Sequence, residues 1–431
     1  MNHETFAYHA ALISERWPEL WPRLITQDVE SIPAELTEGL SSTLSIDGVQ
    51  LSSRHDRVKE AKLQAASLPD ESVLHLYGTG LGDLPRALLT RPSLKRLEVK
   101  IMNGALFVLV LQLLEQDDWL SDPRVELMMA GDENEIRLPF FALPPELLLV
   151  EDAAAPIRDR LVSELDRPFA SSRFHADNPQ LTARLAENRP LLISDGDVAS
   201  LFGLAQGKCA LVVASGPTLQ DKLPILQHQL HTRRQHYLLI CVDTALVFLQ
   251  RHGIQPDVVV TIDEGIQCHH LPATCSAQTT LIYYPAVPTA TLQAWQGPRK
   301  AAYSRNPLYK SLREAIPKGV LHSGGSVIHP TVDLAVQMGC RDVILLGADF
   351  AFPGGLTHSG WADGTLGPSA RQALTWAING HGRKVNTNPN FSAYRVELER
   401  YIARHPEVRF WNSSQKGARI AGCHYHPEYV I

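Results

Sequence analysis

A repeated pattern in the second half of the sequence constrains the fold most. Apolar runs with few polar residues alternate with helical stretches between residues 208 and 347: KCALVVA, YLLICV, DVVVTI, TTLIYYP and DVILLG. Such runs are typical of strands that are buried on both faces of a parallel sheet. Because stretches such as DTALVFLQRHG between them have a helical pattern, the sequence predicts a Rossmann-like, open, doubly wound α/β sheet.

The first half repeats this alternation on a smaller scale. SVLHLYG reads as a strand, TGLGDLPRALL as a glycine turn and a helix, and SLKRLEV as a second strand. Gly78, Gly80 and Gly82 resemble a nucleotide-binding turn, but a glycine turn here also serves packing alone. We therefore expect a helical N-terminal segment over 1–65, a small Rossmann-like domain over 66–180 and a catalytic domain over 181–431.

Composition argues against several classes of function. Forty Lys and Arg against 46 Asp and Glu give a net charge of -6, so no basic field is present to hold nucleic acid. The polar start MNHETFAYHAALIS lacks the features of an export signal, which predicts a cytoplasmic protein.

The longest uncharged stretch, 271–298, is interrupted by prolines, so no membrane span is expected. No P-loop motif occurs.

In an open α/β sheet, ligands bind outside the carboxyl ends of the strands. The polar residues directly after the predicted strands are therefore the candidate binding residues: Ser215, Gly216, Pro217, Thr218, Asp243, Thr244, Asp263, Glu264 and Asp349.

Two glycine turns in the second half are expected to bind anions. The turn from Ser215 to Thr218 opens a helix, where free N–H groups and the helix dipole favour a phosphate, unless the turn is only a cap. Gly324, Gly325 and Ser326 form a second turn before a helix. Two such sites in one crevice would suit a ligand with two separated acidic groups.

The carboxylates have open roles. Asp243 and Asp349 can be simple N-caps. Asp263 and Glu264 are adjacent at a strand end, where a hydroxyl clamp, a general base and a metal ligand are all chemically possible. Thr357 and His358 lie in a loop rich in Pro and Gly; a neutral His358 imidazole can act as a general base, or it can be a plain surface side chain.

No metal site is assigned from the sequence. Cys268, His269, His270 and Cys275 are zinc-ligand types, but their spacing fits no established zinc motif.

Four segments together resemble a known family. They are LVVASGPTL, CVDTALVFLQRHGIQPDVVVTIDE, GGSVIHPTVDLAVQMGCRDVILLGADFAFPGGLTHS and NFSAYRVELERYIARHPEVRFWNSSQKGARIAG, in order over about residues 205–422. The chain resembles the motility accessory factor (Maf) proteins, flagellin glycosyltransferases with a domain shared with MptE-like pterin pyrophosphokinases. The GTGLG segment is similar to the family's N-terminal Rossmann-like region.

The resemblance implies a reaction and its partners. A nonulosonic acid of the pseudaminic or legionaminic type would pass from a CMP-activated donor to Ser or Thr of flagellin, in the cytoplasm and in support of motility. The central domain would be similar to bacterial CMP-sialyltransferases. No further cofactor is required, although a divalent metal remains possible.

The sequence departs from those sialyltransferases at the expected site. Their Gly-Asn-Gly-Pro-Ser turn corresponds to residues 214–218, with Ser215 in place of the Asn, and their tyrosine after Asp-Phe corresponds to Ala351. His358 matches the Maf pattern, so we expect it to serve as base or phosphate partner, with Asp263 as the other catalytic candidate.

Two rival functions stay open. One is a pterin-type diphosphotransferase that uses ATP, with magnesium held by Asp243, Asp263 or Asp349. The other is a non-catalytic factor that binds flagellin.

Overall fold

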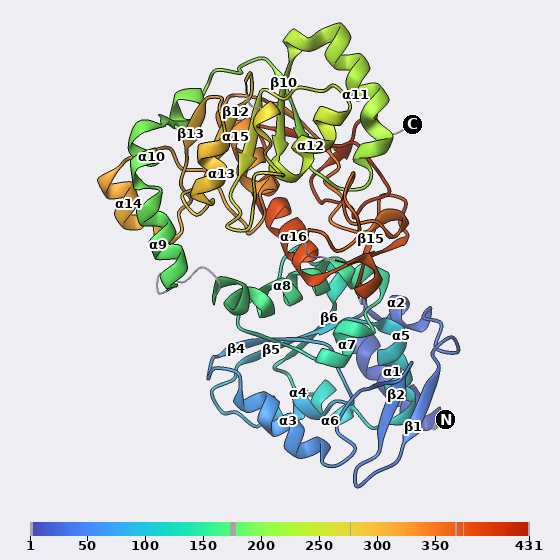
Figure 1. Cartoon of the computed structure of the whole chain (residues 1–431). Helices are drawn as coiled ribbons and strands as arrows, with labels where there is room; N and C mark the ends of the chain where they lie inside the picture. The colour runs from blue at the N-terminus through green and yellow to red at the C-terminus, as the bar shows by residue number, and fades with distance from the viewer. Residues whose placement is uncertain (1–2, 173–177, 276, 367–368, 374, 430–431) are drawn as a thin grey trace. The chain divides into compact units, whose positions relative to one another are not determined.

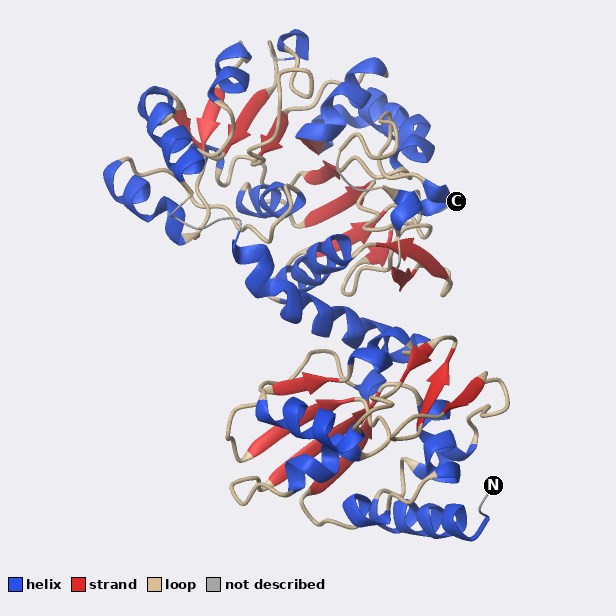
Figure 2. Cartoon of the chain, turned by 60° about the horizontal axis from the view of Figure 1, so that its bottom comes forward, coloured by secondary structure: helices blue, strands red, loops and turns tan. Residues whose placement is uncertain are grey.

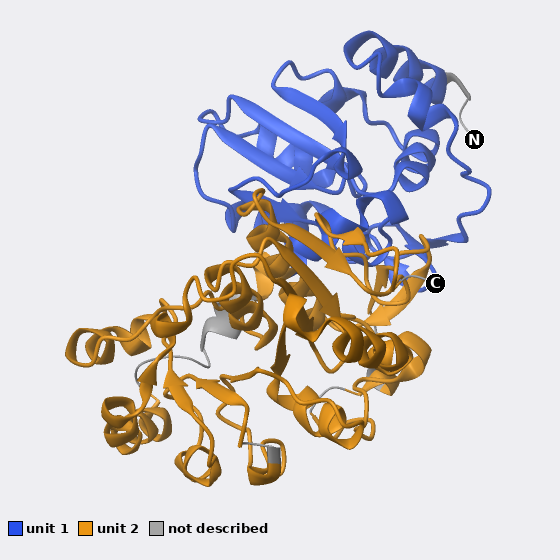
Figure 3. Cartoon of the chain, turned by 90° about the horizontal axis from the view of Figure 1, so that it is seen from above, with its two compact units in different colours: residues 1–162 blue, residues 163–431 orange. Residues whose placement is uncertain are grey.

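A computed structural model describes residues 3–172, 178–275, 277–366, 369–373 and 375–429. The chain forms two compact units, Met1–Val162 and Ser163–Ile431, shown in two colours in Figure 3. In each unit, helices lie beside the larger of its sheets (Figure 2). Within the described residues, no helix combines the length and the apolar character that a membrane crossing needs.

Unit 1 is built around a four-stranded parallel sheet in the order β6-β5-β4-β7. Its strands are β1 (Ala34–Thr37), β2 (Thr43–Ile46), β3 (Val49–Gln50), β4 (Val73–Tyr77), β5 (Arg96–Ile101), β6 (Val125–Met129) and β7 (Phe140–Ala142). Its helices are α1 (His3–Arg16), α2 (Trp21–Ile25), α3 (Arg57–Ala66), α4 (Asp83–Leu89), α5 (Gly104–Leu113), α6 (Asp117–Leu120), α7 (Pro144–Leu148) and α8 (Ala155–Ser172), and α8 continues across the unit boundary.

The N-terminal segment is not purely helical, in contrast to the sequence prediction. Strands β1, β2 and β3 form an antiparallel sheet. The turn between β2 and β3 is Asp47-Gly48, with φ of 49° and 78°. Both angles are positive, as in the two-residue turn that Asp-Gly favours because it matches the twist of a hairpin.

Unit 2 contains a nine-stranded, wholly parallel sheet in the order β18-β17-β14-β9-β10-β11-β12-β13-β8. Figure 1 labels β10, β12 and β13 of this sheet. The strands of unit 2 are β8 (Gly196–Asp197), β9 (Cys209–Val213), β10 (Tyr237–Val242), β11 (Val258–Thr261), β12 (Thr280–Tyr283), β13 (Arg299–Ala301), β14 (Asp342–Leu346), β15 (Thr375–Ile378), β16 (Lys384–Thr387), β17 (Arg409–Asn412) and β18 (His424–Tyr425). Its helices are α9 (Pro179–Glu187), α10 (Arg189–Ser194), α11 (Leu219–Arg233), α12 (Asp243–Arg251), α13 (Thr289–Ala294), α14 (Lys310–Ala315), α15 (Ile328–Gln337) and α16 (Pro389–Ala403). The predicted doubly wound α/β fold is confirmed.

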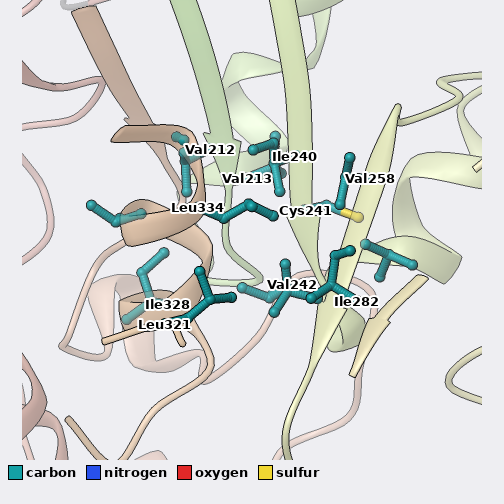
Figure 4. Packing of buried hydrophobic residues seen from close by; sticks show 14 of the residues in the cluster. Val212, Val213, Ile240, Cys241, Val242, Val258, Ile282, Leu321, Ile328 and Leu334 are labelled. Carbon is teal, nitrogen blue, oxygen red and sulfur yellow. The ribbon is translucent and has the colours of Figure 1, made fainter. Parts of the chain in front are cut away.

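The central strands of unit 2 are apolar on both faces because helices cover both. All six residues of β10 are buried. Figure 4 shows Leu334 of α15 near Val212 and Val213 of β9, and Ile328 of α15 near Leu321. Right-handed crossovers place α11 and α12 on one face, and the return to β14 places α15 on the other. The strand ends are thereby held by a rigid core.

Candidate functional site

The order of the strands in unit 2 reverses beside β9, which pairs with β10 on one side and β14 on the other. At this switch point the chain after β9 meets the chain after β14. The Gly216 N–H donates to the Gly347 carbonyl at 2.8 Å. A Cβ at Gly216 would lie 2.3 Å from that carbonyl oxygen, so the close approach requires glycine. This is the place where open α/β sheets bind ligands.

Asp349 occupies the N-terminus of α11. Its buried carboxylate accepts hydrogen bonds from the Thr218 N–H at 2.8 Å and from the Thr218 hydroxyl at 2.6 Å. Thr218 therefore does not cap α11 with its own side chain. Burial raises the pKa of Asp349 to about 6, although the Thr218 hydrogen bonds oppose this shift. The Thr218 amide, which we expected to bind a phosphate, thus donates its hydrogen bond to a carboxylate of the protein itself.

A second set of hydrogen bonds continues across the neighbouring strand ends. The hydroxyls of Ser215 and Thr244 share a hydrogen bond of 2.8 Å. Asp243, buried at the start of α12, accepts from the Thr261 hydroxyl and from the Thr244 N–H, both at 2.7 Å. Burial raises the pKa of Asp243 to about 7. Polar side chains therefore connect the ends of β9, β10 and β11, next to the Asp349–Thr218 pair.

Asp263 and Glu264 follow β11 but are exposed. One oxygen of Asp263 accepts from the Gly265 N–H at 2.7 Å. The two carboxylates are solvated, so their adjacency does not by itself require a ligand, contrary to the argument from the sequence.

The loop that carries Thr357 and His358 lies on these strand ends. The Ser359 N–H donates to the Ser215 carbonyl at 2.7 Å, and its hydroxyl donates to the Gly216 carbonyl at 2.8 Å. Thr357 is buried directly before His358. The structure therefore brings this loop and the Ser215 turn together at the strand ends.

His358 is held as a neutral imidazole. Its ring packs edge-on against Phe391 with a centroid distance of 6.4 Å. Its Nδ1 is buried and has no hydrogen-bond partner among the described residues. Burial lowers the pKa of His358 to about 4, so at neutral pH the ring is in the form that accepts a proton.

The Gly324-Gly325-Ser326 turn precedes α15, which runs back toward the start of β14, so it lies at the same edge of the sheet as the other strand ends. The Ser326 N–H donates to Nδ1 of His329 at 3.2 Å, while Nε2 of His329 donates to the Tyr394 carbonyl at 3.0 Å. A Cβ at Gly325, where φ is 91°, would lie 2.9 Å from Cε1 of Tyr394. The turn is thus packed against α16.

Helix α16 contacts both the His358 loop and the Gly325 turn. Phe391 of its first turn packs on His358 and on Phe352, and Tyr394 of its next turn meets Gly325. Among the described residues, no hydrogen bond directly joins the Ser215 turn to the Gly325 turn. The two turns lie at the same edge of the sheet. Helix α16 contacts the Gly325 turn directly, and it contacts the His358 loop, which is hydrogen-bonded to the Ser215 turn.

The segment after β17 is a part of the site that the sequence analysis missed. The Ala418 N–H donates to the Asp349 carbonyl at 2.8 Å, and a Cβ at Gly417 would lie 2.7 Å from Oδ1 of Asp349. Lys416 forms an ion pair of 2.6 Å with Asp221 in the first turn of α11. The rule that strand ends carry function applies to β17 as well, so the segment NSSQKG could have been found from the sequence.

The described residues contain no group of three or more His, Cys, Asp and Glu side chains arranged to hold a metal ion. The carboxylates of Asp243 and Asp349 instead receive hydroxyl and amide donors from the protein.

The glycine turn of unit 1 also has an internal hydrogen-bond acceptor. The N–H groups of Thr79 and Gly80 both donate to Oε1 of Glu146 at 2.6 Å. A Cβ at Gly78 would lie 2.9 Å from Cδ of Glu146. The side chain of Glu146 thus lies against the GTGLG turn.

Comparison with known proteins locates the family likeness within unit 2. Residues 183–355 match the model of a family described as 6-hydroxymethylpterin diphosphokinase MptE-like. The expected MptE-like domain is confirmed. This segment contains every predicted site residue except Thr357 and His358, which lie two and three residues after its end. No curated protein matches the chain.

Solved structures give low similarity. A Maf glycosyltransferase from Magnetospirillum magneticum AMB-1 is 16% identical, with a TM-score of 0.45, over 99% of this chain and 75% of that chain. A spermidine synthase from Thermotoga maritima is 15% identical, with a TM-score of 0.23, over 30% of this chain and 49% of that chain.

Proposed function

We propose that the protein is a glycosyltransferase that moves a nonulosonic acid, of the pseudaminic or legionaminic type, from a CMP-activated donor to Ser or Thr of flagellin in the cytoplasm. The observation that carries this proposal is that the Ser215 turn, the Asp243–Thr244 pair, Asp349 and the loop of His358 lie together at the ends of neighbouring strands. The ordered resemblance of four segments to Maf proteins supplies the choice of donor and acceptor.

The geometry supports distinct roles for these residues. The acceptor hydroxyl must lose a proton, and we assign the neutral imidazole of His358 as the base that accepts it. As CMP leaves, negative charge grows on its phosphate, and donors placed there stabilise the transition state. Lys222 and Lys416 bring positive charge to the first turn of α11, where the charge of Lys222 interacts with that of Asp349. The two lysines thus balance the carboxylates of Asp221 and Asp349 at this helix end.

Intact-mass analysis tests the reaction directly. The purified chain is incubated with flagellin and a panel of CMP-activated nonulosonic acids, and flagellin should gain the mass of whole nonulosonic acid residues. No gain with any donor, together with stable binding of flagellin, would instead favour a non-catalytic flagellin-binding factor.

A second candidate is favoured by the description of the matching family. It is a magnesium-dependent transfer of diphosphate from ATP to a pterin alcohol, with Asp243, Asp263 or Asp349 holding the metal. Ligand-induced stabilisation separates the two candidates. A rise of Tm with CMP alone supports the glycosyltransferase, whereas a rise only with ATP and Mg²⁺ supports the diphosphotransferase.

A further inference from the structure

Three aromatic rings cluster beside the ends of β10 and β11, outside the roles assigned above. The Trp361 indole stacks on His270 with a centroid distance of 5.1 Å and an interplanar angle of 29°. His269 lies against His270 at 3.8 Å. His270 is buried in the middle, whereas His269 is exposed and Trp361 is half-buried. The cluster therefore presents ring surface to solvent near the candidate site.

The cluster is fixed to the hydrogen-bonded strand ends. The indole N–H of Trp361 donates to the Thr244 carbonyl at 2.9 Å, and the Thr244 hydroxyl bonds Ser215. The preceding Gly360 has a φ of 77°, and a Cβ there would lie 2.8 Å from Cδ2 of Phe248 on α12. Because the backbone is held this closely, the indole is positioned before any ligand arrives.

Asp263 adds a carboxylate to the same place. It is exposed at the end of β11. Burial raises the pKa of Asp243 and lowers that of His270, and the negative charge of Asp263 adds to the first shift and opposes the second. The site thus combines flat rings with a hydrogen-bond acceptor at one side.

We propose that Trp361, His270, His269 and Asp263 form the nucleobase subsite of the donor and select cytosine over uracil. Aromatic rings bind any base by stacking. A carboxylate accepts a hydrogen bond from the N4 amino group of cytosine. Uracil has a carbonyl oxygen at that position, which a carboxylate repels. This inference rests on the proposed function, because it assumes a CMP-activated donor.

The position along the sheet agrees with this assignment. Neighbouring strands are about 5 Å apart, so the end of β11 lies about 10 Å from the end of β9. A nucleotide whose phosphate lies at the β9–β14 switch point can therefore extend along the strand ends and bring its base to the ring cluster.

Thermal-shift titrations of the full chain with CMP and with UMP test the subsite. The wild type should bind CMP about tenfold more tightly than UMP. A side chain that hydrogen-bonds the correct base favours it over the wrong base by about 1–3 kcal/mol of binding free energy. Asp263→Asn, whose amide can donate to the uracil carbonyl, should bring the two affinities within about threefold. Glu314→Gln replaces an exposed carboxylate of α14 by an amide in the same way and should leave the preference for CMP over UMP unchanged.

The rings are tested by two further variants. Trp361→Ala and His269→Ala should weaken CMP and UMP alike, by about tenfold for the tryptophan, without altering their ratio. The Tm of each variant without ligand shows whether it is folded. If Trp361→Ala is unfolded, His269→Ala still tests the subsite, because His269 is exposed and its replacement should leave the fold intact.

Each outcome has a defined meaning. If wild type binds CMP but Asp263→Asn keeps the full preference, or if neither ring variant weakens binding, the subsite is wrong while the proposed function stands. Equal binding of CMP and UMP by the wild type also overturns the subsite. If the wild type binds neither nucleotide, the CMP-dependent function fails and the subsite fails with it.

Discussion

Burial at the strand ends shifts the pKa values of three side chains so that the neutral form of each is favoured. The pKa values of Asp243 and Asp349 rise to about 7 and about 6, and that of His358 falls to about 4, mainly because burial disfavours each charged form. Groups shifted in this way are concentrated at functional sites. Asp243 and Asp349 can therefore each gain or lose a proton near neutral pH, while His358 stays neutral.

The role of His358 as a base leads to a kinetic prediction. His358→Ala should lower kcat of sugar transfer by about 100-fold or more, the usual contribution of a general base. Protonation of the imidazole should lower the wild-type rate near its pKa of about 4, and this step of the pH profile should be absent from His358→Ala. His381→Ala, on an exposed turn, is the matched control and should keep full activity. A wild-type rate in His358→Ala would remove this role.

At the scale of elements, two glycines allow the segments after β9, β14 and β17 to meet. A Cβ at Gly216 would lie 2.3 Å from the Gly347 carbonyl oxygen, and one at Gly417 would lie 2.8 Å from Cα of Asp349. Because backbone must move in both cases, Gly216→Ala and Gly417→Ala should each destabilise unit 2 by about 2 kcal/mol or more in urea unfolding.

The matched control for these variants is Gly265→Ala. Its Cβ would meet only Oδ1 of the exposed Asp263 side chain, at 3.3 Å. We expect a change within about 0.5 kcal/mol. If all three variants lose equal stability, the close approach of the strand ends does not explain the need for Gly216 and Gly417.

The β4–α4 turn gives a prediction about pH and stability. Burial raises the pKa of Glu146 from 4.5 to about 7. Between these two pH values the unfolded chain is ionised while the folded side chain is protonated, so the stability of unit 1 should fall as pH rises through this window. Glu146→Gln keeps an oxygen for the Thr79 and Gly80 amides and should abolish the fall.

The size of this effect follows from the shift. At pH 8 the Glu146→Gln variant should be more stable than the wild type by up to about 3 kcal/mol, and at pH 4 the two should be equal. Urea unfolding at the two pH values, with exposed Glu115→Gln as control, measures the difference. A constant difference at both pH values would show that the charge of Glu146 is not its cause.

Much of the element level could be predicted from the sequence, because strand and helix patterns are local. The apolar runs became β9, β10, β11, β12 and β14 with a Rossmann-like order. The hairpin at Asp47-Gly48 was missed although its turn signal is local too. Side-chain partners were not predictable: Thr218 is held by Asp349, 131 residues away, so its expected role as a cap could not be judged from its neighbours.

At the scale of the whole molecule, each unit has its own hydrophobic core. One cluster of buried side chains runs from Ile13 to Leu143, and the larger one runs from Leu181 to Tyr429. A separate core is what allows a segment of chain to unfold as its own cooperative unit. The candidate site lies wholly on elements of unit 2.

Two matched core variants test this division. Ile101 on β5 and Ile240 on β10 are both fully buried. Replacing either by Ala should cost about 2–5 kcal/mol. In calorimetry we expect two unfolding transitions, with Ile101→Ala lowering the Tm of one and Ile240→Ala lowering that of the other. CMP should raise only the transition that Ile240→Ala lowers, because a ligand stabilises the unit that binds it. A single transition that both variants lower equally would mean that the two cores unfold as one.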